Sequence, residues 1–154
     1  HALLKDYGGN PQNPVLFTRL SSDIFYSMSE DIRSRYDYHE LSRTAFSARL
    51  PRREGRSVAV VSAGTADGEV TWEAARTLDY LGIEAHVHED CGVAGLWRLL
   101  ANLEDINKAD IIIVVAGLDA ALASVMGGLT GTAPRKTERP RLPVCWQAAL
   151  PASA

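Results

Sequence analysis

Two uninterrupted apolar runs, each ending in a turn of small residues, most constrain how this chain can fold. They span residues 58–61 and 111–115, and lead into Ser62-Ala63-Gly64 and Ala116-Gly117-Leu118 respectively. Short apolar runs that stop at turn residues are typical of parallel strands covered by helices on both faces. The sequence therefore predicts that both runs are strands of a parallel sheet.

Helical spacing and a third strand pattern connect these runs. Val70, Ala74, Leu78 and Leu81 recur every three or four residues, Asp67 is placed to cap that helix, and Gly82 to end it. Residues 84–88 alternate as in a strand, and leucines at helical spacing follow (Leu96, Leu99, Leu100 and Leu103). A last helix is expected from about residue 118 to 125. The alternation predicts right-handed crossovers and an α/β, three-layer, doubly wound parallel sheet of flavodoxin-like type.

The flanking segments have a different character. Residues 14–20 and 44–50 resemble strands and residues 21–35 a helix, which together predict a small partial β-α-β region over residues 1–52. The polar stretch 51–56 is the expected linker. Residues 130–154 are rich in proline, carry a basic patch and show no period, so they are predicted to be irregular. A sheet of three strands would then be incomplete, with an open parallel edge.

Charge and cysteine content exclude several classes of protein. The formal net charge is −3, which gives no electrostatic reason to expect nucleic acid or an anionic membrane as partner. The two cysteines have neither metal-binding nor disulfide spacing, which fits a reducing cytoplasm. No apolar run approaches the length of a membrane span, and no signal peptide opens the chain. We therefore expect a cytoplasmic protein.

The three strand-to-helix turns are the candidate site, because the carboxyl ends of parallel strands meet at one edge of a sheet. The first turn presents small side chains, hydroxyls and backbone N–H groups suited to a phosphate or carboxylate. The alternative interpretation of the first turn is a tight turn followed by a capping aspartate. Neither the G-x-G-x-x-G pattern nor a P-loop lysine is present. The candidate substrate-binding residues in this turn are Ser62, Gly64, Thr65 and Asp67.

The second and third turns add glycines and carboxylates. Gly92 and Gly95 would let a ligand approach the backbone, and Asp90 could hold a hydroxyl or a cation; a glycine-relieved helix start is the alternative. In the third turn, Gly117 is a candidate binding residue and Asp119 the candidate catalytic residue, placed for general acid/base work or cation binding. A carboxylate opening a helix is also a routine partner of the helix dipole.

Other reactive residues in this region give less support for a functional role. Cys91 has no evident base nearby, so we predict an inert buried thiol. His86 and His88 would share one face of a strand as a possible metal pair, but no third ligand is near. Trp72 and Trp97 are predicted to be packing residues.

Taken together, the three turns resemble the PurE-like domain of the LarB family. The resemblance rests on SVAVVSAGTAD at 57–67, DCGVAGLWRLL at 90–100 and VVAGLDAALASVMGGL at 114–129. NPVLFTRLS at 13–21 and RTA at 43–45 are similar to the small LarB N-terminal region. The resemblance implies a partial N-terminal region over residues 1–52, the first part of a PurE-like domain over residues 56–129, and a non-family tail over residues 130–154.

The resemblance also implies an activity. LarB proteins are pyridinium-3,5-biscarboxylic acid mononucleotide synthases of nickel-pincer cofactor biosynthesis. They carboxylate the pyridinium ring of nicotinate adenine dinucleotide with carbon dioxide and cleave its phosphoanhydride, releasing AMP. A cysteine adds to the ring, Mg²⁺ is the expected metal, and a homo-oligomer is expected. By the motif match the first turn would hold phosphate and ribose, the second would shape the pocket, and Asp119 would take the acidic position of the third.

The sequence departs from the family in several places. Asp119 stands where the family usually has Glu, Trp97 where it has His, and Ala123 where proline is common. Cys145 lies in Val-Cys-Trp rather than the family's Ser-Cys-Ala context, so the nucleophile is not carried over to it. The start at His1 and the altered tail suggest a fragment truncated at both ends and read out of frame after Leu129.

Three alternatives to a LarB activity remain open. The chain could be a non-catalytic fragment that keeps a nucleotide-binding shell. It could instead have the aminoimidazole ribonucleotide carboxylase/mutase-like activity of purine synthesis. A response-regulator-like module shares the layout, but Ser62-Ala63-Gly64 lacks the acidic pair that such a module would need after its first strand.

Overall fold

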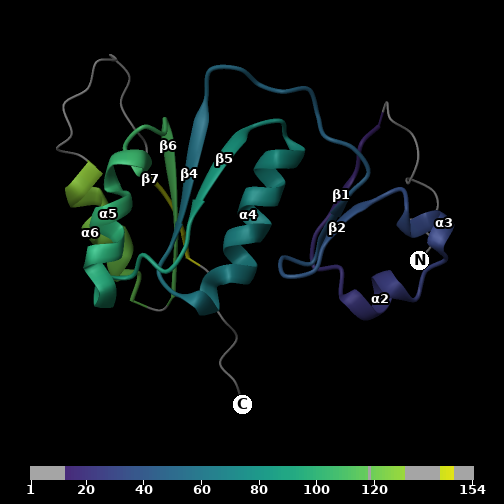
Figure 1. The fold of residues 1–154 in the computed structure, drawn as a ribbon, viewed down its shortest axis with the longest axis horizontal. Coiled ribbons are helices and arrows are strands. Elements are labelled where there is room, and N and C mark those ends of the chain that lie inside the picture. The colour runs from purple at the N-terminus through teal and green to yellow at the C-terminus, as the bar shows by residue number, and fades with distance from the viewer. Residues whose placement is uncertain (1–12, 118, 131–142, 148–154) are drawn as a thin grey trace.

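A four-stranded parallel sheet forms the centre of the molecule (Figure 1). The computed structural model describes residues 13–117, 119–130 and 143–147. The sheet contains β4 (Ser57–Ser62), β5 (Glu84–His88), β6 (Ile111–Ala116) and β7 (Pro143–Gln147), in the order β5-β4-β6-β7. In chain order this is 2-1-3-4, which is compatible with a flavodoxin-like fold. The predicted α/β class with a parallel sheet is confirmed.

Helices cover both faces of the sheet because the strand residues alternate between two apolar clusters. Val58 and Val60 face α4 (Gly68–Tyr80), where Val70, Ala74 and Leu78 pack against them. Ala59 and Val61 face the opposite side, which holds α5 (Leu96–Ile106) and α6 (Ala121–Thr130). The buried helix residues on that side are Leu99, Ile106, Leu122 and Met126. The continuous apolar run of β4 is thus explained by burial on both faces.

The helix boundaries largely follow the sequence prediction. A short 3₁₀ turn, η1 (Thr65–Asp67), precedes α4, and a second one, η2 (Val93–Gly95), precedes α5. Helix α4 ends at Tyr80, and Gly82 just beyond its C-cap has a φ of 72°, in the left-handed region that favours glycine. Helix α6 begins at Ala121, later than expected, and continues to Thr130.

Strand β7 corrects the prediction that residues 130–154 are irregular. It pairs in parallel with β6, from Ile112 opposite Pro143 to Ala116 opposite Gln147. The edge that three strands would have left open is therefore occupied, which satisfies backbone groups of β6 that would otherwise lack partners. A strand this short between prolines has too little pattern to be read from sequence. Residues 131–142 and 148–154 lie outside the described residues.

The N-terminal region corrects the predicted β-α-β unit. Strands β1 (Leu16–Phe17), β2 (Asp37–His39) and β3 (Thr44–Phe46) form an antiparallel sheet in the order β1-β3-β2. The expected single helix is two short ones, α2 (Ser22–Tyr26) and α3 (Glu30–Arg33). It breaks between them, where Ser27 Oγ donates to the Ile24 carbonyl, because serine side chains compete with the helix for backbone groups. The tight β2–β3 connection then makes the pairing antiparallel.

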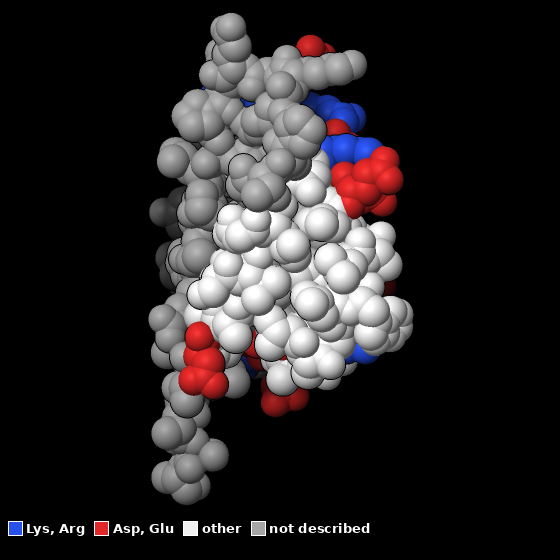
Figure 2. All heavy atoms as spheres, turned by 90° about the vertical axis from the view of Figure 1, so that its left-hand side faces the viewer, with Lys and Arg blue, Asp and Glu red and all other residues white. Residues whose placement is uncertain are grey.

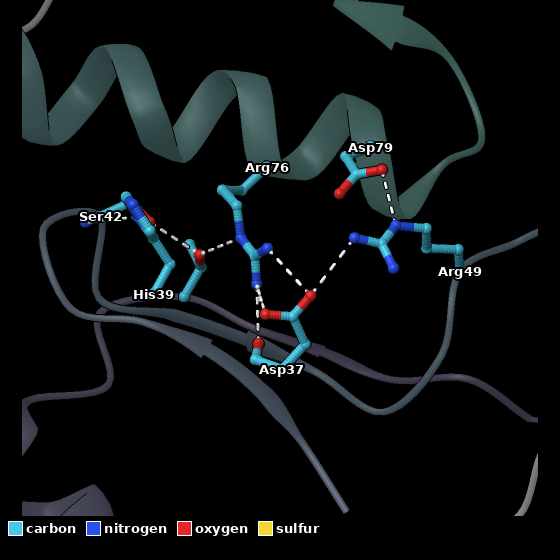
Figure 3. Close-up of polar contacts among 7 residues, drawn as sticks. Asp37, His39, Ser42, Arg49, Arg76 and Asp79 are labelled. Carbon is cyan, nitrogen blue, oxygen red and sulfur yellow. Dashed lines mark hydrogen bonds and ion pairs between the residues drawn. The ribbon is translucent and has the colours of Figure 1, made fainter.

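Arg76 joins this small sheet to α4 (Figure 3). Its guanidinium donates to the Asp37 carboxylate at 3.0 Å and to the Asp37 carbonyl at 2.7 Å. The same group lies 4.1 Å from the centre of the Phe46 ring, and its side chain is only 12% exposed. Arg49 extends the network by bonding Asp79 on α4 at 2.7 Å. A half-buried ion pair and a cation–π contact therefore hold the two parts together.

Replacing Arg76 with methionine is expected to lower the free energy of unfolding by about 2 kcal/mol, because hydrogen bonds to charged groups contribute about 1.5–3 kcal/mol. Arg52→Met is the matched control, since Arg52 is 74% exposed where it pairs with Glu84. An exposed pair of that kind contributes about 0–1 kcal/mol. Urea denaturation of both variants measures the difference, and equal losses would show that the Arg76 network is no stronger than a surface pair.

No helix within the described ranges has the length and apolar character needed to cross a membrane.

Candidate functional site

The three predicted turns lie together at the carboxyl edge of the sheet. The Ala63 N–H donates to the Val115 carbonyl at 2.9 Å, joining the first turn to the end of β6. The Cys91 N–H donates to the Ser62 carbonyl, also at 2.9 Å, joining the second turn to the first. Strand β4 connects outward to β5 on one side while β6 lies on the other, so this edge includes a topological switch point. The proximity of the turns, expected from sequence, is a feature of the structure.

The first turn has backbone donors available. The N–H groups of Thr65 and Ala66 have no backbone acceptor among the described residues, as is usual at the start of a helix. Asp67 does not cap α4 through its side chain, which corrects the sequence prediction. Its Oδ2 instead accepts the Gly64 N–H at 2.8 Å, because η1 places the carboxylate over the preceding turn. Asp67 therefore stabilises the turn itself.

Ser62 contributes a buried hydroxyl at this edge. The residue ends β4 and is fully buried, and its Oγ has no hydrogen-bond partner within the described part of the chain. Alternation along β4 places it on the same face as Val58 and Val60, which is the face covered by α4. A buried hydroxyl without a partner costs free energy. Ser62 is therefore the candidate residue with the clearest unmet requirement for a polar partner.

Gly92 lets the second turn press against the first. A Cβ at Gly92 would lie 2.4 Å from the carbonyl oxygen of Ala63, a backbone atom that cannot move aside. Asp90 adopts a φ of 55°, and Arg98 holds it by donating Nε to its carbonyl at 2.6 Å and Nη2 to its Oδ1 at 3.2 Å. Gly95 is close to the same guanidinium, since a Cβ there would lie 2.4 Å from Arg98 Nη2. Gly92 is therefore required for the close packing of the two turns, whereas a side chain at Gly95 would displace only the flexible end of Arg98.

Arg98 was not among the candidates from sequence. It fixes the second turn and offsets the charge of Asp90. The available signal was its position in the first turn of α5, from which a long side chain reaches back over the preceding loop.

The third turn presents the candidate catalytic carboxylate. Asp119 is exposed, and the Ala120 N–H behind it donates to the Gly117 carbonyl at 2.9 Å. A Cβ at Gly117 would meet no described atom within 4 Å, so the described residues leave space beside this glycine. Ala120 has a φ of 43°, which is strained for a residue with a side chain. Leu118 lies outside the described residues.

Cys91 is fully buried. Burial raises the pKa of its thiol, with the Asp90 charge adding to the rise and Arg98 opposing it. The protonated thiol is a weak nucleophile. The geometry therefore agrees with the interpretation that Cys91 does not perform covalent catalysis.

In a Cys145→Ser background, the native protein at pH 8 is expected to react with a disulfide reagent at least about tenfold more slowly than the urea-unfolded chain, because burial blocks the thiolate. The pKa of the Cys91 thiol is higher in the folded protein than in the unfolded chain, so the stability of the fold depends on pH. The stability that comes from the protonated thiol is fully present below the unfolded thiol pKa and is lost as pH rises through the folded value. Cys91→Ala should remove that alkaline loss. Equal labelling rates in native and unfolded protein would contradict the assignment.

The described residues do not build a metal centre from protein groups alone. No group of three or more His, Cys, Asp or Glu side chains lies close enough in the described ranges to hold an ion. His86 lies near Glu84, with 3.6 Å between Nε2 and Oε1, and His88 Nε2 is buried without a described partner. The Mg²⁺ implied by the resemblance would therefore have to be held largely by substrate oxygens.

Trp97 corrects a sequence prediction. It was expected to pack in the interior, yet it is 68% exposed at the start of α5. Trp72 is half-buried, donates Nε1 to Glu89 at 3.2 Å and lies against His39. Leucine and tryptophan have the same apolar character in a periodicity pattern, so sequence could not tell which side of α5 faces solvent.

A large cavity among the described residues lies away from the three turns. It has a volume of about 960 Å³ and runs along β5 beside α4. None of the nine candidate residues lines it. Much of its charged lining is already paired, as in the Arg49–Asp79 and Arg52–Glu84 contacts. We therefore interpret it as the open seam between the small sheet and α4, and place the candidate site at the turns, where free donors converge.

Comparison with known proteins gives a limited result. No family model matches this chain. It is similar to the uncharacterized protein MJ0165 of Methanocaldococcus jannaschii, with 42% identity over 74 residues. That match covers 47% of this chain and 29% of the archaeal protein, so it spans less than a third of the relative.

Proposed function

We propose that the three turns bind the ribose and phosphate of a nucleotide, and that the chain is part of a carboxylase of LarB/PurE type. The observation that carries the binding proposal is the junction of the three turns through the Ala63–Val115 and Cys91–Ser62 hydrogen bonds. This junction brings free amides, hydroxyls and carboxylates to one edge of the sheet, where open α/β sheets bind ligands.

Each turn has a chemical role in this proposal. The free amides of Thr65 and Ala66 are suited to phosphate oxygens. Ser62 Oγ, which lacks a described partner, can bond to a ligand oxygen. The carboxylates of Asp67 and Asp90 are acceptors suited to ribose hydroxyls. Gly92 keeps the second turn against the first, Gly95 leaves room for the Arg98 guanidinium, and no described atom would meet a Cβ at Gly117 within 4 Å.

The proposed reaction rests on the resemblance of the three motifs to LarB. The substrate is nicotinate adenine dinucleotide, the carboxyl source is carbon dioxide, and hydrolysis of the phosphoanhydride releases AMP. Asp119 is exposed at the strand end and is proposed as the acid/base group. Assembly of the whole enzyme as a homo-oligomer belongs to the same proposal, as does a cytoplasmic location.

A second candidate function is nucleotide binding without catalysis. The observation that favours it is the burial of Cys91 together with its raised thiol pKa, which removes that thiol as the nucleophile of the proposed reaction. In this case the three turns would bind a nucleotide and release no product.

Incubation with nicotinate adenine dinucleotide, bicarbonate and Mg²⁺, followed by chromatography for AMP, tests the proposal. Asp119→Asn is expected to lower AMP release by about 10²-fold or more while keeping dinucleotide affinity, because general acid/base groups contribute about 10²–10⁴-fold. Asp105→Asn is the control, since this exposed carboxylate pairs with Lys108 on the outside of α5.

The outcomes separate the candidate functions. AMP release supports the carboxylase, and calorimetric binding without AMP supports the non-catalytic alternative. Carboxylation of aminoimidazole ribonucleotide in place of the dinucleotide would support the purine-type activity. If the protein binds none of these nucleotides, the proposed site is wrong.

A further inference from the structure

Trp97 has the largest exposed fraction among the exposed large apolar residues of the described chain, at 68%. It lies in the first turn of α5, directly after the second turn of the proposed site, and Val93, Leu96 and Leu100 are also exposed. Figure 2 shows the broad uncharged surface over α5 and α6 to which this helix contributes. An exposed indole costs free energy in water unless something covers it, so an apolar surface of this kind indicates a binding role.

Arg98 contacts both the Trp97 indole and the second turn of the proposed site. The guanidinium carbon lies 5.1 Å from the centre of the Trp97 ring, within range of a cation–π contact. The same guanidinium bonds the Asp90 carbonyl at 2.6 Å and the Asp90 carboxylate at 3.2 Å. The position of the ring is therefore coupled to the backbone of the second turn, and the second turn is coupled to the first through Cys91 and Ser62.

We propose that Trp97 is the base-stacking platform of the nucleotide site, with the planar heteroaromatic ring of the ligand lying against the exposed indole. The inference rests on the proposed function, since it needs the ribose and phosphate to be held at the three turns. Stacking on an aromatic side chain tolerates different bases, because every base has a π-face. The free amides then select for phosphate, and Trp97 selects nucleotides over sugar phosphates.

Calorimetric titration with AMP and with ribose 5-phosphate tests the assignment, because the two probes differ by the base. Trp97→Ala is expected to lower AMP affinity about tenfold and to leave ribose 5-phosphate affinity unchanged. Trp97→Phe, which keeps an aromatic face, should stay within about threefold of the wild type. AMP should also quench an indole emission that is absent from Trp97→Phe.

Leu100→Ala is the matched control, because Leu100 is 49% exposed one turn further along the same helix. If this surface docks a protein, Leu100→Ala and Trp97→Ala should both change the sedimentation coefficient and neither should change AMP affinity. That result would overturn the stacking role. Unchanged AMP affinity in Trp97→Ala would overturn the stacking role and leave the proposed nucleotide site standing. A wild type that binds neither probe would overturn both.

Discussion

Leu99→Ala is expected to lower the free energy of unfolding by about 2–5 kcal/mol, the usual range for truncating a buried leucine. The Leu99 side chain is fully buried in the cluster that joins α5 to β4 and β6. Its removal deletes apolar contacts and leaves a cavity that the packed strands cannot fill. Denaturation in urea, followed by circular dichroism, measures the loss.

The neighbouring leucine provides the control. Leu100→Ala removes the same atoms from the next side chain of α5, which is 49% exposed. Surface substitutions of this kind usually change stability by less than about 0.5 kcal/mol. Similar losses in the two variants would mean that α5 is turned differently about its axis, and would remove the support for an exposed Trp97.

Gly82→Ala is expected to destabilise the protein by about 3 kcal/mol, from about 1 kcal/mol for a side chain at positive φ and about 1–3 kcal/mol for overpacking. Gly82 has a φ of 72°, and an added Cβ would lie 2.3 Å from the Pro51 carbonyl oxygen. That oxygen belongs to the loop entering the main sheet, where Arg53 N–H donates to the Gly82 carbonyl at 2.8 Å. The helix end and the loop cannot separate without losing this bond.

Gly127→Ala is the matched control for this substitution. An added Cβ at Gly127, within α6, would meet none of the described atoms within 4 Å. Alanine is the better helix former by about 1 kcal/mol, so this variant should be neutral or slightly more stable. Thermal unfolding of the two variants tests the comparison, and a Gly82→Ala protein as stable as the wild type would contradict the observed helix end.

The proposals about function depend on the same geometry. Gly92 and the Cys91–Ser62 hydrogen bond hold the second turn against the first, and Arg98 couples that turn to Trp97. A nucleotide bound at the turns would therefore contact residues from three separate segments. Any substitution that separates those segments should weaken nucleotide binding even if the changed residue touches no ligand.

Long-range strand pairing is the feature that the sequence pattern indicates least. The antiparallel small sheet depends on Asp37–His39 pairing with Thr44–Phe46, and β2 was missed because three residues carry too little period. Strand β7 is also too short to show a period, and its partner β6 lies well before it in the chain, so no local pattern predicts their pairing. The contact of Arg76 with Asp37 joins residues 39 positions apart, which no local pattern records.

The candidate site was predictable in outline and incomplete in detail. The sequence predicts that Ser62, Asp90 and Asp119 lie at one edge, because the carboxyl ends of parallel strands lie on the same side of a sheet. It did not reveal that Asp67 bonds Gly64 or that Arg98 holds Asp90. The first contact depends on the backbone angles of η1, and the second depends on the direction in which a long side chain extends. Residue types alone predict neither of them.

By itself, the sequence determined the elements whose residues repeat over several turns or form a continuous apolar strand: β4, β6, α4 and α5, with Gly82 as a helix end. Only the tertiary structure decided which leucines of α5 are buried, how the small sheet pairs, and that Trp97 faces solvent. The physical reason is that periodicity reports that a face is apolar, whereas burial depends on which distant surface reaches that face. Leu99 and Leu100 are identical side chains, and only the position of β4 and β6 makes one core and the other surface.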